Sequence, residues 1–287
     1  MGERPRGNWP GPATTLVGVM GDPVAHSLSP LLHNTAFAEL GLDWASTGFH
    51  VPAGGAAGAL EGARSLGLAG LSVTMPHKAA VAALVDERTE VAARLDAVNC
   101  VIRRGDRLIG DNTDGEGFVA SLRRGAGFEP AGRRCLVIGG GGAARAVVLA
   151  LADAGAAEVV VVNRSPERAA RAASLAGPVG RVGEAGEAGA VDLVVNATPA
   201  GMAGGPAPDR PPPVDPAWVG PGQVVADLVY HPAETAWLAA ARAAGATTVA
   251  GVGMLVHQAA TQLLAWTGED PPLRAMWAAV EGALGAG

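Results

Sequence analysis

Short apolar runs alternate with segments of helical periodicity through the first part of the chain. The runs predict buried strands at residues 15–20, 47–51, 71–74, 97–103 and 107–110, the last two as a hairpin. Ser29 and Pro30 are typical of a helix start, with Ser29 at the N-cap, and Gly41 is typical of the helix end. Strands that alternate with helices in this way favour a mainly parallel sheet.

The same alternation starts again near residue 133. Strands are predicted at residues 135–138, 158–163, 192–196 and 224–228, and helices at 142–154, from 166, at 252–266 and at 272–284. The Gly- and Pro-rich segment 201–216 predicts a long surface loop. Two series of strands and helices, in a chain too long for one small core, predict an α/β fold with two domains.

Composition and charge exclude several classes of protein. The 287 residues are 49% hydrophobic but only 4% aromatic, so Val, Leu and Ala must fill the cores. The formal charge of −6, without a basic stripe, argues against a nucleic-acid partner. There is no apolar run of about 18 residues, so no membrane span is predicted. The polar residues 1–12 lack the apolar run of a signal peptide and are expected to form a disordered tail.

The two cysteines, Cys100 and Cys135, both lie in apolar runs that read as strands. Their separation does not match the spacing of a zinc site or a redox pair, and no metal site is expected. We expect them to be buried, reduced thiols in a cytoplasmic protein.

A glycine-rich turn follows the predicted strand 135–138 and opens the next helix. It reads Gly139-Gly140-Gly141-Gly142-Ala143-Ala144. Gly139, Gly141 and Ala144 match the Gly-x-Gly-x-x-Gly/Ala pattern of dinucleotide-binding turns. Gly139 allows a tight turn, Gly141 lets backbone N–H groups approach a pyrophosphate, and Ala144 lets helix and strand pack closely. The alternative is a glycine-rich turn that binds nothing.

The end of the following strand indicates which dinucleotide binds. An NAD site usually carries an acidic residue there, which bonds the ribose 2′-hydroxyl. This chain instead has Asn163-Arg164-Ser165, with Arg168 one turn later. Two guanidinium groups suit a 2′-phosphate dianion, so the sequence favours NADP. The alternative is two solvated arginines beside an N-cap serine.

Polar side chains gather at the predicted strand ends of the first part. They are Ser27, Ser29, Thr74, Lys78 and Asp114, and Asn99 joins them from inside the predicted strand 97–103. Ligands of α/β sheets bind beyond the carboxyl ends of the strands, and hydroxyls and amides suit a polyhydroxylated substrate. Lys78 and Asp114 could form a proton-transfer pair in which the carboxylate orients the ammonium. Taken singly, Ser29 could be only a helix cap, Asp114 could cap a helix that starts at Gly115, and Lys78 could be a solvated helix residue.

These segments resemble the shikimate dehydrogenase (shikimate/quinate dehydrogenase) family, from about Val17 to Trp266. The resemblance rests on GDPVAHSLSP at 21–30, VTMPHK at 73–78, AVN at 97–99, NTDG at 112–115, the turn at 139, NRS at 163–165, NAT at 196–198, DLVY at 227–230 and GVGMLVHQ at 251–258. It implies a mainly parallel α/β substrate domain (1–115, completed by 252–287), a Rossmann-type NADP-binding domain (116–251) and a cleft between them. It further implies reversible, NADPH-dependent reduction of 3-dehydroshikimate to shikimate, a step of chorismate and aromatic amino acid biosynthesis.

The resemblance also implies a role for individual residues. Lys78 and Asp114 are expected to act at the reacting hydroxyl. The implied substrate-binding residues are Ser27, Ser29, Thr74, Asn99, Tyr230 and Gln258. The implied cofactor-binding residues are Gly139, Gly141, Gly142 and Ala143 in the glycine turn, Asn163, Arg164, Ser165 and Arg168 at the phosphate, and Asn196, Ala197, Thr198, Gly251, Met254 and Leu255 at the nicotinamide.

The chain departs from the family pattern in three places. Ser72 stands where Asn is usual, Cys100 stands where Thr is frequent, and the Gly/Pro-rich loop near Gly204 matches poorly. Two other functions share most of these features: a dehydrogenase of quinate or an aminated analogue, and a non-catalytic NADPH-binding regulator. The predicted partner is a small-molecule substrate. The sequence leaves the oligomeric state open, and a homodimer is compatible with it.

Overall fold

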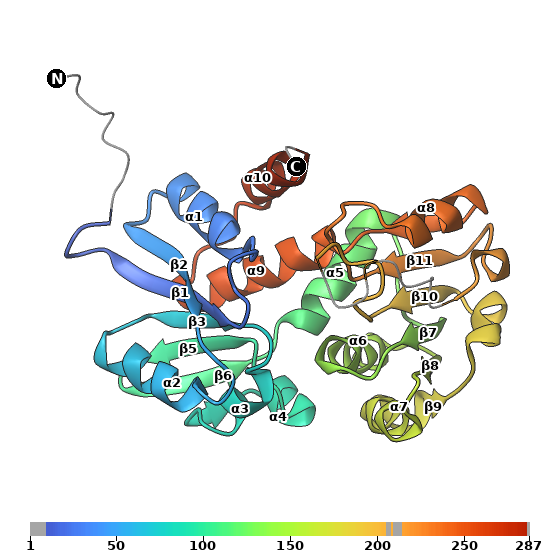
Figure 1. The fold of residues 1–287 in the computed structure, drawn as a ribbon, viewed down its shortest axis with the longest axis horizontal. Helices are drawn as coiled ribbons and strands as arrows, with labels where there is room; N and C mark the ends of the chain where they lie inside the picture. Colours follow the sequence, from blue (N-terminus) through green and yellow to red (C-terminus); the bar gives the residue numbers. More distant parts are fainter. Residues whose placement is uncertain (1–9, 205–207, 209–213, 286–287) are drawn as a thin grey trace.

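The computed structural model describes residues 10–204, 208 and 214–285, which form two six-stranded sheets (Figure 1). Helices α5 (Asp114–Ala126) and α9 (Val252–Thr267) lie between the sheets and pack on each other. The predicted tail lies mostly outside the described residues, as does the middle of the predicted loop at 201–216.

The first sheet has the strand order β2-β1-β3-β5-β6-β4. Its strands are β1 (Thr15–Gly21), β2 (Trp44–His50), β3 (Gly70–Val73), β4 (Glu87–Arg88), β5 (Cys100–Arg104) and β6 (Arg107–Asp111). β1 pairs in parallel with β2 and β3, and β6 pairs in parallel with β4. β5 is antiparallel to β6, because a two-residue turn joins the two strands. On its other side β5 is antiparallel to β3. The sheet is therefore mainly parallel, as expected, with one reversed strand.

Helices cover both faces of the first sheet. They are α1 (Ser29–Glu39), α2 (Ala56–Ser65), α3 (Lys78–Ala82), α4 (Glu90–Leu95) and α10 (Leu273–Gly285). One core places α2, α3 and α4 against Met20, Val73 and Val101. The other places α1, α9 and α10 against Val17 and Ile102. The C-terminal helices therefore complete the core that the N-terminal strands begin.

Two details of this half differ from the sequence prediction. Ser29 is the first residue of α1 rather than its N-cap, and Leu28 occupies the cap position without a side-chain hydrogen bond. β4 and α4 were not predicted, because a two-residue strand and a six-residue helix are too short to show a period.

The second sheet is parallel throughout, in the order β12-β11-β10-β7-β8-β9. Its strands are β7 (Arg134–Ile138), β8 (Glu158–Val162), β9 (Gly180–Val182), β10 (Leu193–Asn196), β11 (Val224–Asp227) and β12 (Thr247–Val249). Its helices are α6 (Gly142–Asp153), α7 (Pro166–Ala173) and α8 (Ala236–Ala243), with 3-10 turns at η1 (Ser174–Val179), η2 (Ala185–Ala190) and η3 (Pro216–Trp218). Valine runs are typical of such strands, which are buried on both faces.

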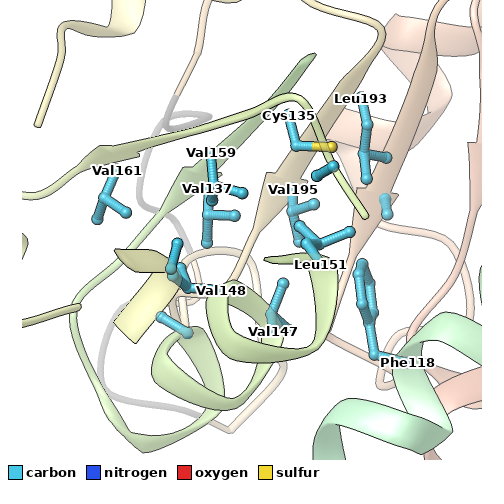
Figure 2. Close-up of a cluster of buried hydrophobic side chains, with 14 of the residues drawn as sticks. Phe118, Cys135, Val137, Val147, Val148, Leu151, Val159, Val161, Leu193 and Val195 are labelled. Carbon is cyan, nitrogen blue, oxygen red and sulfur yellow. The ribbon is translucent and has the colours of Figure 1, made fainter. Parts of the chain in front are cut away.

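Figure 2 shows the core on one face of this second sheet. Val147, Val148 and Leu151 of α6 pack on strand side chains from β7, β8 and β10. Phe118 of α5 joins the same cluster. The other face is covered in part by Trp237 and Leu238 of α8. Helices therefore cover both faces of this sheet, and the ends of its strands stay uncovered by them.

Glycines let α5 cross its neighbours closely. A Cβ atom at Gly117 would lie 2.6 Å from the backbone nitrogen of Gln258, and one at Gly253 would lie 2.1 Å from Ser121 Oγ. The helices can therefore touch only because both positions lack a side chain. The predicted domain boundaries fall in the first turn of α5 and at the start of α9, and the division at these residues stays a prediction.

None of the helices in the described part of the chain combines the length and hydrophobicity needed to cross a bilayer. Cys100 and Cys135 are both buried and unpaired with each other, as expected.

Candidate active site

A cavity of about 180 Å³ lies where the two halves of the molecule meet. It is lined by all eight residues predicted to act in catalysis or substrate binding: Ser27, Ser29, Thr74, Lys78, Asn99, Asp114, Tyr230 and Gln258. Four residues predicted at the cofactor line it too: Ala143, Gly251, Met254 and Leu255. The structure therefore brings the whole first set together with four of the fourteen predicted cofactor residues, and the other ten lie outside the lining of this cavity.

The strand directions explain why these distant segments meet. β1, β3 and β6 point the same way, so the residues that follow them share one edge of the sheet. Asn99 was expected inside a strand, but it immediately precedes β5. Because β5 is reversed, its amino end lies at the same edge, and Asn99 joins the cluster. Residues 112–114 follow β6 and complete it.

Lys78 and Asp114 form an ion pair, in which Lys78 Nζ donates a hydrogen bond to Asp114 Oδ2. The lysine side chain is 22% exposed and the aspartate side chain 7%. Lys78 is therefore not a solvated helix residue. Asp114 is the first residue of α5, and its side chain is directed to the pair rather than to the helix end. Lys78 is also the only lysine in the chain, since every other member of its 21 Lys and Arg residues is an arginine.

The Asp114 carboxylate is held on its second oxygen by Asn99. Asn99 Nδ2 donates to Asp114 Oδ1 at 2.7 Å and to Thr113 Oγ1 at 3.0 Å, and Asn99 Oδ1 accepts from the backbone nitrogen of Thr113 at 2.8 Å. These contacts occupy both N–H groups of the amide. In this structure Asn99 orients the carboxylate, and the predicted direct contact of Asn99 with substrate stays a prediction.

The glycine turn has the geometry expected of a dinucleotide site. Gly139 has a φ of 127°, and a Cβ there would lie 2.9 Å from the carbonyl oxygen of Ala197. Around Gly141 and Gly142 the space beyond the backbone is open, so a phosphate could approach their N–H groups. Gly141 caps α6 without a side chain, which leaves the positive end of that helix accessible.

Two arginines stand at the end of β8, where the cofactor phosphate was expected. Arg164 and Arg168 are exposed, and no ion pair to either is found within the described residues. Asn163 Nδ2 donates to the carbonyl of Ser165 at 3.1 Å, and Ser165 Oγ caps α7 by accepting from the Arg168 backbone nitrogen at 3.3 Å. Ser165 is thus the N-cap of α7, as in the alternative of two solvated arginines beside an N-cap serine. It also fixes the turn from β8 into α7, which carries both guanidinium groups.

The predicted nicotinamide wall closes the cavity from the second sheet. A Cβ at Gly251 would lie 2.3 Å from the carbonyl oxygen of Leu228, so only glycine lets the start of α9 approach the end of β11. Met254 and Leu255 extend this wall along α9. Tyr230 faces the same cavity, and burial raises the pKa of its hydroxyl. An ion pair, a row of hydroxyls and an open glycine turn therefore share one cleft.

Comparison with known proteins agrees with this geometry. Residues 19–101 match the model of the shikimate dehydrogenase substrate binding domain, 125–200 that of shikimate/quinate 5-dehydrogenase, and 251–281 that of the shikimate 5′-dehydrogenase C-terminal domain. The shikimate dehydrogenase (NADP(+)) of Moorella thermoacetica is 46% identical over 284 residues, which cover 96% of this chain and 95% of that protein. The chain belongs to the shikimate dehydrogenase family.

Solved structures of shikimate dehydrogenases have the same fold. One in complex with NADP⁺ has a TM-score of 0.91 at 33% identity and covers 98% of this chain and 99% of its own. The Thermus thermophilus enzyme in complex with NADP(H) and shikimate has a TM-score of 0.87 at 36% identity, over 94% and 100% of the two chains. The similarity therefore spans both sheets and the helices between them.

Two of the three departures from the family pattern, Ser72 and Cys100, differ in their relation to the cavity. Ser72 is 5% exposed and lines the cavity, although it was not predicted as a ligand. Cys100 is fully buried, and burial raises its pKa well above the usual value, so it is an inert thiol. Val19, Val73 and Leu228 also line the cavity and were missed, since apolar strand residues carry no signal of a site.

Asp227 is the most informative residue that sequence reasoning left without a role. It ends β11 and is 1% exposed. Its carboxylate accepts hydrogen bonds from Asn196 Nδ2 at 2.9 Å, the backbone nitrogen of Val229 at 3.0 Å and Thr235 Oγ1 at 2.8 Å. Asn196 Oδ1 in turn accepts from Thr198 Oγ1 at 2.7 Å. Asp227 thus holds the loop of predicted nicotinamide residues. The signal available in the sequence was an acid at the end of an apolar strand.

Burial raises the pKa of Asp227 from 3.8 to about 6, against the opposing effect of its three hydrogen bonds. The unfolded chain loses this proton near pH 4 and the folded chain near pH 6. The free energy of unfolding should therefore fall by about 3 kcal/mol as the pH rises between these values, and stay constant above them. Asp227→Asn should abolish this loss, measured as the difference in urea unfolding between wild type and variant at about pH 4 and pH 7. An equal difference at both pH values would contradict the assignment.

Proposed function

We propose that this chain catalyses the reversible reduction of 3-dehydroshikimate to shikimate with NADPH. The observation that carries the proposal is the Lys78–Asp114 pair in a cavity that the glycine turn and the start of α9 also reach. Family membership supports the same reaction, because relatives of this length and similarity are named shikimate dehydrogenase (NADP(+)). The reaction belongs to chorismate and aromatic amino acid biosynthesis.

The residues present fit NADP. The open backbone at Gly141 and Gly142 lies at the start of α6, where a pyrophosphate is favoured. The exposed guanidinium groups of Arg164 and Arg168 suit a 2′-phosphate. When bound there, NADPH supplies the hydride for the substrate ketone. The wall formed by Asn196–Thr198 and Met254 would hold the nicotinamide beside the cavity.

In the proposed mechanism the protein supplies charge and a proton. Lys78 Nζ stands at the substrate ketone oxygen and donates its proton as negative charge develops on that oxygen. Asp114 holds the ammonium in place, and Asn99 fixes the carboxylate. Ser27, in the turn before α1, and Ser29, the first residue of α1, bind the substrate carboxylate. In the reverse direction, the neutral amine of Lys78 accepts the hydroxyl proton and becomes the ammonium.

Quinate or an aminated analogue is the nearest competing substrate. Ser27 and Ser29 favour shikimate, and the two arginines favour NADP over NAD. The proposal is tested by following NADPH absorbance in four reactions that pair shikimate or quinate with NADP⁺ or NAD⁺. We expect the highest kcat/KM with shikimate and NADP⁺. A higher value with quinate would move the assignment to the competing enzyme, and tight NADPH binding without turnover would make the protein a regulator.

We also propose a cytoplasmic location, which buried free thiols and an NADPH-dependent reaction both support. The partner is the small-molecule substrate. A homodimer is compatible with the family and is tested by sedimentation of the purified protein.

A further inference from the structure

A buried glutamine lies directly behind the substrate residues. Gln262 is 0% exposed and follows Gln258 by one turn of α9. Gln262 Nε2 donates to Gln258 Oε1 at 2.9 Å and to the carbonyl oxygen of Asn99 at 3.2 Å. It therefore joins two predicted substrate-binding residues from distant parts of the sequence. Burying an amide among the apolar residues of α9 is unfavourable unless its hydrogen bonds are made.

His33 of α1 lies on the other side of the Gln262 amide. The imidazole is completely buried, which lowers the pKa of His33 to about 4, and the Gln262 side chain opposes this shift. The ring is therefore neutral at pH 7. Its Nδ1 lies 3.1 Å from Ser46 Oγ. His33 Nε2 and Gln262 Oε1 are both buried, and neither makes a hydrogen bond within the described residues. The Gln262 amide is therefore held through its nitrogen, by the carbonyl oxygen of Asn99 and by Gln258 Oε1.

These contacts set the direction of the Gln258 amide. Its Oε1 accepts from Gln262, and its Nε2 donates one hydrogen to the carbonyl of Leu255 at 2.9 Å. One N–H of the amide remains, and Gln258 lines the cavity. If the amide were reversed, its nitrogen would face the Gln262 nitrogen and its oxygen would face the Leu255 oxygen. Both contacts would be repulsive.

We propose that Gln262, held by the backbone carbonyl of Asn99, is a positioning residue that fixes the Gln258 amide with an N–H in the cavity. The site then selects substrates that place an acceptor oxygen at this point. The inference rests on the proposed role of Gln258 in binding shikimate, and it adds a residue that never touches the substrate.

The test replaces Gln262 with methionine, which has a similar volume and no N–H donor. We expect Gln262→Met to raise the KM for shikimate about tenfold, which corresponds to one hydrogen bond, and to change kcat less than about threefold. The NADPH dissociation constant, followed by fluorescence, should not change. The matched control is Leu263→Val, a change at the next buried residue of the same helix. It should lower the melting temperature and leave the KM for shikimate as it is.

A double-mutant cycle separates positioning from a general loss of packing. Because Gln262 acts through Gln258, Gln262→Met should raise the KM much less in a Gln258→Ala background than in the wild type. Equal effects in both backgrounds would overturn the proposal, as would a Gln262→Met variant that loses only thermal stability. Should the methionine variant not fold, Gln262→Glu provides the same test, because it keeps the shape and places an oxygen against Gln258 Oε1.

The cycle also distinguishes the two proposals. If Gln258→Ala leaves the KM for shikimate unchanged, the substrate-binding role of Gln258 fails and the inference fails with it. If Gln258→Ala raises the KM but Gln262→Met does not, only the positioning role of Gln262 is wrong.

Discussion

Lys78→Ala is expected to lower kcat by about 10²- to 10⁴-fold and to change the KM for shikimate far less. This is the range for loss of one positioned proton donor. The reason is that the ammonium acts on the oxygen that becomes charged in the transition state, rather than on the groups that hold the substrate. Initial rates in both directions measure the effect. An unchanged kcat would remove Lys78 from the chemistry.

Lys78→Arg is the sharpest companion variant. Arginine keeps the positive charge and can pair with Asp114, but its pKa is too high for ready proton transfer. If the proton matters, the arginine variant should be nearly as slow as the alanine variant. If charge alone matters, it should keep most of the activity. Every other Lys or Arg position of the chain is an arginine. The one lysine therefore stands where proton transfer, which arginine performs poorly, is proposed.

The second large effect is expected at the cofactor phosphate. The double variant Arg164→Ala/Arg168→Ala should raise the KM for NADP⁺ by about 10²-fold and leave the KM for NAD⁺ nearly unchanged. Two charge-assisted hydrogen-bonding groups are lost to one cofactor, and NAD⁺ has no 2′-phosphate for them to bind. Kinetics with both cofactors measure the change in preference.

Arg242→Ala provides the matched control for this prediction. Arg242 is an exposed arginine of α8 that pairs with Glu234, so the same change of charge is made away from the glycine turn. It should leave both constants as they are. An equal loss of affinity for NADP⁺ and NAD⁺ in the double variant would show that the two guanidinium groups do not read the phosphate.

Sequence reasoning could predict the longer strands of both sheets, because their apolar runs are bounded by clear turn residues, but it missed the short strands β4 and β9. It also placed Thr74 and Asp114 near one another, since residues that follow parallel strands share an edge. It could not predict α8, whose alanines give little periodicity, or β12, which has three residues. The predicted hairpin is confirmed and accounts for the reversal of β5 against β6. The pairing of β5 with β3, and hence the position of Asn99, depends on contacts that local sequence does not encode.

The hydrogen-bonded networks of the site were equally beyond sequence reasoning. Asp227 bonds Asn196 and Gln262 bonds Asn99, both distant in the chain, so the role of each depends on how the elements pack. Neither Asp227 nor Gln262 lines the cavity. Each of them nevertheless holds residues that are predicted to contact a ligand. Residues of this kind become visible only when the buried hydrogen bonds are traced from donor to acceptor.

A crystal structure of the complex with shikimate and NADPH tests the central claim most directly. Shikimate is already reduced and NADPH carries its hydride, so the complex cannot react. The account predicts that the reacting hydroxyl oxygen lies within hydrogen-bonding distance of Lys78 Nζ, with the nicotinamide against Met254. Shikimate bound elsewhere, or Lys78 and Asp114 turned apart into solvent, would contradict it.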